Sequence, residues 1–144
     1  DCGITTDVIA GFCGETEQDH QDTLTLMEHV VFDSAFMFAY SNRPGTLASR
    51  KYEDDIPYEE KTRRLNEIIA LQGRMSLKSN EKEVGRILKV LVEGPSKKNP
   101  DELCGRASSN KMCVFPSRGE KPGDYCEVEV VSVTSATLLC KRID

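Results

Sequence analysis

The sequence contains no apolar run of the roughly 20 residues that a membrane-spanning helix needs. It also lacks the basic and then apolar pattern of a secretory signal at its start. With 19 Lys and Arg against 24 Asp and Glu, its net charge of −5 excludes a uniformly basic nucleic-acid-binding protein but permits a local basic patch. These absences predict a globular, cytoplasmic protein with no membrane partner.

Close pairs of metal ligands are also missing. The chain has two histidines, and its six cysteines are widely spaced without a C-x-x-C pair, at positions 2, 13, 104, 113, 126 and 140. Metal sites usually take their ligands from close pairs, so we predict no metal site. The absent secretory signal favours a reducing compartment, so we predict free thiols. The chain opens at Asp1 rather than Met, directly before an apolar segment, and we therefore expect a piece of a longer protein.

The first half of the chain predicts a βαβ unit. Residues 4–12 are almost continuously apolar, which is typical of a strand covered on both faces. Thr16 and Asp19 form a capping box for a helix over 17–30, and residues 35–40 form a second buried strand. Two parallel strands cannot complete such a sheet, so we expect the missing strands outside this chain or in a partner.

A glycine turn joins the first strand to the helix. Gly11 and Gly14 flank it, and backbone N–H groups at a helix start can bind a ligand. The acidic Glu15 and Glu17 argue against an anion there, so the turn is either a site for another ligand or a tight corner. His20 follows on the buried helical stripe with no supporting nucleophile, and we interpret it as structural rather than as a general base.

A polar segment, residues 41–46, follows the second strand at the end where parallel sheets bind ligands. Arg43 there either contacts a phosphate or carboxylate or is a solvated loop residue. Asp54–Pro57 predicts a helix start, and the apolar stripe continues to about Leu77. Its basic residues indicate a solvated face or, alternatively, a surface for RNA: Lys61, Arg63, Arg64, Arg74 and Lys78.

From Gly85 onward, apolar residues recur at every second position, as in a strand, rather than every 3.6 residues, as in a helix. Short strands are predicted over 87–93, 103–106, 111–115, 125–133 and 136–140, with a Pro-Gly turn at 121–124. Five short strands predict a small OB-like β-barrel, so the fold class is α/β plus all-β with a boundary near residues 77–85. Basic residues lie in or beside its loops, at Lys97, Lys98, Arg106, Lys111, Arg118 and Lys121.

Six ordered stretches resemble one family. They are TDVIAGFCGET (6–16), FAYSNRPGT (38–46), KTRRL (61–65), VLVEGPSKK (90–98), GRASSNK (105–111) and PGDY (122–125). Together they resemble the C-terminal part of the radical SAM methylthiotransferases of the MiaB-type tRNA enzymes. The resemblance implies that residues 1–77 are the C-terminal βαβ part of a radical SAM (TIM-like) partial barrel, and that 78–141 are a TRAM RNA-binding β-barrel.

The resemblance also implies site residues. Those implied for S-adenosylmethionine are Asp7, Ile9, Gly11, Gly14, Glu15, Phe38, Tyr40 and Ser41. Those implied for RNA are Arg43, Lys97, Lys98, Arg106, Asn110 and Lys111. The implied partners are a tRNA anticodon stem-loop and the remainder of the parent chain.

The sequence departs from the family in two places. Cys13 stands where members often have Pro, which keeps both glycines of the turn. The C-x-x-x-C-x-x-C triad is absent, so the 4Fe–4S ligands of the parent enzyme lie outside this chain, which has no catalytic residue of its own.

The parent reaction implied by the resemblance inserts a methylthio group at carbon 2 of an isopentenylated adenosine beside the anticodon. Two alternatives stay open. One is a fragment of the related enzyme that modifies an aspartate of a ribosomal protein, and the other is a stand-alone RNA-binding TRAM protein without catalysis.

Overall fold

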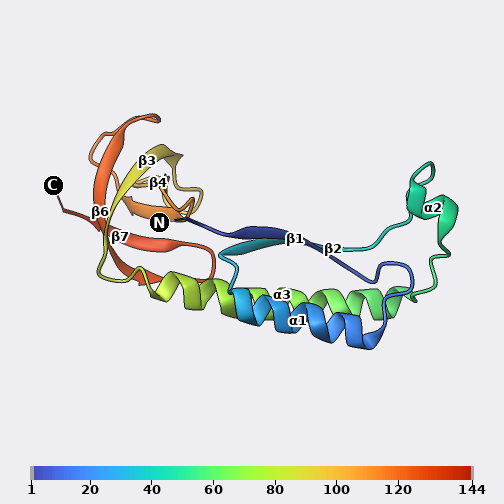
Figure 1. Ribbon diagram of the computed structural model, residues 1–144. Helices are drawn as coiled ribbons and strands as arrows, with labels where there is room; N and C mark the ends of the chain where they lie inside the picture. Colours follow the sequence, from blue (N-terminus) through green and yellow to red (C-terminus); the bar gives the residue numbers. More distant parts are fainter. Residues whose placement is uncertain (1, 144) are drawn as a thin grey trace. The chain divides into compact units, whose positions relative to one another are not determined.

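The computed structural model describes residues 2–143 and divides them into two compact units (Figure 1). One unit is residues 5–75, and the other is residues 76–143 together with residues 2–4. Across the described residues, no helix combines the length and the apolar character needed to cross a membrane. Each unit is described by itself.

The first unit contains the predicted βαβ arrangement. Its strands β1 (Thr5–Ala10) and β2 (Ser34–Ala39) are parallel and in register from Thr5 opposite Ser34 to Ala10 opposite Ala39. Helix α1 (Glu17–Val30) connects them, and Thr16 and Asp19 form its capping box as predicted. A short helix, α2 (Leu47–Lys51), and a long one, α3 (Tyr58–Glu81), follow. The sequence did not predict α2, which begins where the Thr46 hydroxyl accepts a hydrogen bond from the Ser49 amide at 3.2 Å.

Both long helices run along one face of the two-stranded sheet (Figure 1). That face forms a core of Ala10, Met27, Ile68 and Leu71, with neighbours that include Val8 and Met37. The opposite face is open in this chain, where Ile9, Phe36 and Phe38 are 54%, 68% and 55% exposed. The expectation of strands buried on both faces is therefore wrong for this chain, because α1 and α3 cover the same side.

The second unit is a closed five-stranded barrel, as predicted, and its strand order is β3-β4-β5-β7-β6. The strands are β3 (Ile87–Pro95), β4 (Glu102–Ala107), β5 (Met112–Pro116), β6 (Tyr125–Val133) and β7 (Leu138–Arg142). Alternate residues point inward and make an apolar core around Phe115, Val90, Val92, Val128, Val130 and Leu138. The predicted turn before β6 is present, with the Asp124 amide donating to the Lys121 carbonyl and Gly123 at a φ of 98°.

The last turn of α3 is hydrogen-bonded to the barrel within the same unit. The Asn80 side chain donates to the Thr134 carbonyl at 2.9 Å. The ammonium of Lys111 donates to the Ser79 carbonyl at 3.0 Å and to its hydroxyl at 2.9 Å, and lies 3.3 Å from Glu83. Residues 76–83 thus contribute to the barrel unit although part of this segment is helical.

Candidate functional site

The glycine turn between β1 and α1 uses its own amides. The Gly11 N–H donates to Glu15 Oε2 at 2.9 Å, and the Gly14 N–H donates to Asp55 Oδ1 at 2.8 Å. Carboxylates of the chain therefore take the positions that an anion would occupy at such a turn. The absence of an anion here stays a prediction, and the chain's own carboxylates hold the corner.

Lys61 of α3 lies under this corner. A Cβ on Gly11, which has a φ of 73°, would overlap Cγ of Lys61. The Lys61 ammonium is paired with Asp54 and lies 5.1 Å from the centroid of the Tyr40 ring. Lys61 is only 5% exposed. Its side chain contacts both the glycine turn and the segment after β2.

Arg64, one helical turn further along α3, holds the same corner. Its guanidinium donates to Glu15 Oε1 at 2.8 Å and to the Glu15 carbonyl at 2.9 Å, and to Glu60 at 3.0 Å. The Arg64 side chain is 6% exposed and that of Glu15 is 15% exposed. The interpretation of Lys61 and Arg64 as part of a solvated or RNA-facing surface is therefore wrong, whereas Arg63, Arg74 and Lys78 are exposed.

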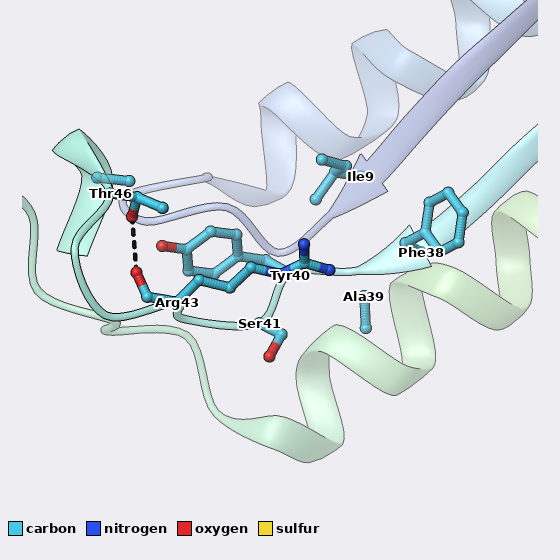
Figure 2. Close-up of a pocket in the computed structure, with 8 residues that line it drawn as sticks. Ile9, Phe38, Ala39, Tyr40, Ser41, Arg43 and Thr46 are labelled. Atoms are coloured by element: carbon cyan, nitrogen blue, oxygen red, sulfur yellow. Dashed lines mark hydrogen bonds between the residues drawn. The ribbon is translucent and has the colours of Figure 1, made fainter.

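A pocket of about 410 Å³ lies beyond the carboxyl ends of β1 and β2 (Figure 2). Its walls are Ile9, Phe38, Ala39, Tyr40, Ser41, Arg43, Thr46 and Ala48. Apolar side chains from both strands make one part of the lining, and hydroxyl groups and a guanidinium from the segment after β2 make the other. Small-molecule pockets typically combine an apolar wall with a few placed polar groups.

The pocket brings together part of the predicted cofactor set. Ile9, Phe38, Tyr40 and Ser41 line it, and so does Arg43, which the sequence assigned to RNA. Gly11, Gly14 and Glu15 belong instead to the corner described above, and Asp7 is an exposed residue of β1. Thr46 ends the polar segment 41–46 that the sequence singled out, and it is the N-cap of α2; Ala48 was not predicted, because α2 gave no recognised signal.

Tyr40 is held from two sides. Its ring meets the Phe12 ring edge-on at a centroid distance of 5.0 Å, and Lys61 approaches it as a cation. Burial, and next the Cys13 side chain, raise the pKa of Tyr40. The hydroxyl is buried and makes no hydrogen bond of ordinary geometry among residues 2–143.

His20 is a structural residue, as the sequence indicated. Its ring is 1% exposed and its Nε2 lies 2.7 Å from Glu67 Oε2. The hydrogen bond with His20, followed by the Arg63 guanidinium, lowers the pKa of Glu67. In the part of the chain that the structure describes, no cluster of three or more His, Cys, Asp or Glu is arranged to hold a metal ion.

The barrel carries a second hollow on its outer surface, a groove of about 520 Å³. It includes two predicted RNA residues, Arg106 and Asn110, and Arg106 donates to Glu93 at 3.1 Å and to the Asn110 carbonyl at 2.9 Å. Three residues of the groove, Arg86, Lys89 and Tyr125, were not predicted. The outward positions of Lys89 and Tyr125 follow from strand alternation, whereas Arg86 precedes β3, and the proximity of the three depends on strand register.

The other predicted RNA residues differ in their surroundings. Lys97 and Lys98 are exposed in the loop between β3 and β4. The Lys111 ammonium is instead directed to Ser79 and Glu83, and its side chain is 9% exposed. Lys111 thus has a structural contact that the sequence did not indicate.

Comparison with known proteins matches residues 81–141 to the TRAM domain family. A tRNA-2-methylthio-N(6)-dimethylallyladenosine synthase from Amoebophilus asiaticus is 55% identical over 139 residues, 96% of this chain and 29% of that protein. The enzyme of the same name from Bacteroides thetaiotaomicron is 52% identical over 138 residues, 96% of this chain and 30% of that protein. Over almost its whole length, the chain is thus similar to a part of these two enzymes.

These relatives confirm the predicted resemblance, and the chain spans about 30% of the length of the curated proteins it matches. Among solved structures, the apo form of Mycoplasma genitalium RNase R aligns with a TM-score of 0.31 and 9% identity, over 67% of this chain and 19% of that one. That alignment supports no conclusion.

Proposed function

We propose that this chain is the C-terminal part of a tRNA-modifying radical SAM methylthiotransferase. In this proposal residues 1–77 complete the catalytic barrel and residues 78–141 bind RNA. The observation that carries it is the identity of 55% across 96% of the chain with an enzyme named for 2-methylthio-N(6)-dimethylallyladenosine synthesis. The TRAM match over residues 81–141 supports the division of roles.

The open face of the β1–β2 sheet supports the barrel assignment. Ile9, Phe36 and Phe38 leave a large apolar area uncovered, and a two-stranded parallel sheet is rarely complete by itself. In the proposed enzyme the remaining strands of the parent chain extend this sheet. The pocket at the carboxyl ends of β1 and β2 then opens at the end of the barrel where ligands bind.

The pocket residues fit the adenosine portion of S-adenosylmethionine. Ile9, Phe38 and Ala39 offer an apolar wall for a purine ring, and Ser41 and Thr46 offer hydroxyl groups. When bound, this cofactor supplies the methyl group and, with an iron–sulfur cluster held elsewhere in the parent enzyme, the radical chemistry. The chain's own residues bind and orient it and exclude water.

Glu15, Lys61 and Arg64 have a positioning role in this proposal. Their contacts hold the glycine turn and Tyr40 in place beside the pocket, and both Glu15 oxygens accept hydrogen bonds from within the chain. The resemblance implied that Glu15 binds the cofactor. We assign Glu15 instead to support of the glycine turn. The RNA set is revised in the same way: Lys97, Lys98, Arg106 and Asn110 are kept, and Lys111 is assigned to the contact between α3 and the barrel.

A segment exchange tests the proposal. The matching segment of the Bacteroides thetaiotaomicron synthase is replaced by this chain, and the chimera is expressed in cells that lack the enzyme. We expect mass spectrometry of digested tRNA to show the 2-methylthio nucleoside. A chimera that folds and holds its clusters but leaves tRNA unmodified would contradict the proposal. A methylthio group on a ribosomal protein instead would favour the alternative, in which the substrate is an aspartate of that protein.

A further inference from the structure

The groove on the barrel has a row of three side chains across three neighbouring strands. Leu91 of β3 is opposite Arg106 of β4 on one side and opposite Tyr125 of β6 on the other. The residues before and after Leu91, Val90 and Val92, are buried in the core, so Leu91 and its two partners lie on the outer face. The row thus places an aliphatic floor between a guanidinium and a phenol ring.

Tyr125 is 63% exposed, whereas Phe115, the other aromatic residue of the barrel, is 1% exposed. The ammonium of Lys89 lies 4.8 Å from its ring centroid. An exposed aromatic ring beside a cation provides a stacking surface for a nucleic-acid base and a charge for its phosphate. The barrel core does not need this ring, which contributes nothing to the buried cluster.

The charge of the groove favours an anionic ligand. Its lining contains Lys89, Arg106 and Arg86, of which Arg86 pairs with Glu83 at 2.8 Å, against Glu93 as the acid within the described lining. Arg106 pairs with Glu93 at 3.1 Å, and both side chains are about two-fifths exposed, at 41% and 42%. Exposed ion pairs of this kind contribute little, so a phosphate can replace Glu93 at a small cost.

We infer that this groove is a subsite for an unpaired nucleotide of RNA. The base stacks on the Tyr125 ring above Leu91, and Lys89 and Arg106 contact the flanking phosphates. The nucleotide is unpaired because a base within a duplex is already stacked on both faces and cannot reach a protein ring. This inference rests on the proposed RNA binding of the barrel and adds the ligand form and the residues that select it.

Fluorescence anisotropy with the full 144-residue chain tests the subsite. The probe is a labelled, unstructured RNA of about 12 nucleotides, within the site sizes of OB-type barrels, and the same RNA annealed to its complement. We expect tighter binding of the single strand. Tyr125→Leu raises its Kd about fivefold or more, whereas Tyr125→Phe, which keeps the ring, stays near the wild-type value.

Two controls separate stacking and charge from general effects. Tyr58, 76% exposed in α3, is the matched aromatic residue, and Tyr58→Leu leaves RNA binding unchanged. Glu93→Gln releases Arg106 and tightens binding, whereas Glu59→Gln, an equal change of charge in α3, does not. Tyr125→Thr, which keeps a residue suited to a strand, provides the same test if the leucine variant does not fold.

The outcomes distinguish the subsite from the broader proposal. Equal Kd values for wild type and Tyr125→Leu, or equal binding of single strand and duplex, overturn the subsite. If the Lys97→Ala, Lys98→Ala double variant still weakens binding in that case, RNA binding by the barrel stands. A wild-type chain that binds neither RNA overturns both.

Discussion

Cγ of Lys61 occupies the space that a Cβ on Gly11 would need. Residue 11 is thus glycine for two reasons, because its φ of 73° is also in the left-handed region. The turn after β1 can rest on α3 only with no side chain at this position. The pocket wall at Tyr40 depends on the same lysine, whose ammonium lies 5.1 Å from the ring centroid.

Gly11→Ala tests this close approach. We expect a loss of about 2–3 kcal/mol in the free energy of unfolding, from the left-handed backbone and the overlap together. Gly14→Ala is the matched control, since Gly14 has a φ of 77° but open space around its Cβ position, and it should lose about 1 kcal/mol. Urea unfolding of the whole chain measures both values, and equal losses would contradict the role of Lys61.

Glu15→Gln tests the buried ion pair with Arg64. Removing one partner leaves the other charge buried, so we expect a loss of about 3 kcal/mol. Glu17→Gln is the comparison, because its side chain is 52% exposed and its ion pair with Arg63, which is 41% exposed, is on the surface. We expect less than about 1 kcal/mol for that variant. A smaller loss for Glu15→Gln than for Glu17→Gln would show that the corner is not held by this pair.

The loss of stability at acid pH should depend in part on the protonation of Glu60. Hydrogen bonds from Arg63, and then from Arg64, lower the pKa of Glu60 to about 2 from a reference value of 4.5. A carboxyl whose pKa falls on folding stabilises the protein above its unfolded pKa, and that stability is lost as the pH falls toward 2. Thermal unfolding followed from pH 5 to pH 2 should therefore be less pH-dependent in Glu60→Gln than in wild type. Parallel curves for the two proteins would argue against this assignment.

Lys97 and Lys98 are predicted to contact phosphates through the loop between β3 and β4. The double alanine variant should bind single-stranded RNA more weakly and reduce the slope of log K against log salt by up to about 1.4, or about 0.7 for each contact. Lys51→Ala with Lys78→Ala removes the same charge from α2 and α3 and is the control. An unchanged slope in the loop variant would remove these lysines from the RNA surface.

The sequence predicted those helices and strands whose spacing of apolar residues is visible within a few consecutive residues. The bounds of β6, residues 125–133, and of α1, residues 17–30, agree with the structure because alternation and a capping box are local signals. The burial of Arg64 could not be predicted in this way. Its partner Glu15 lies 49 positions away, and a buried arginine and a solvated one look alike on a charged helix.

The groove on the barrel shows the same limit. Alternation from the buried Cys126 and Val128 places Tyr125 on the outer face, so its exposure was within reach of the sequence. Its neighbours Lys89 and Arg106 were not, because they are set by the register of β3 against both β4 and β6. Register between strands distant in the sequence depends on packing that no short window contains.

The two units should differ when they are expressed separately. The barrel has a closed sheet and its own core, so we expect residues 76–144 to fold alone. A fragment that begins at residue 82 should be less stable, because it loses the bonds of Asn80 to Thr134 and of Ser79 to Lys111.

Residues 1–75 should self-associate through the open sheet face, and Phe36→Thr with Phe38→Thr should reduce this association. Sedimentation velocity and dispersed NMR spectra check each fragment, and a monomeric, well-ordered 1–75 would contradict the view that its sheet needs further strands.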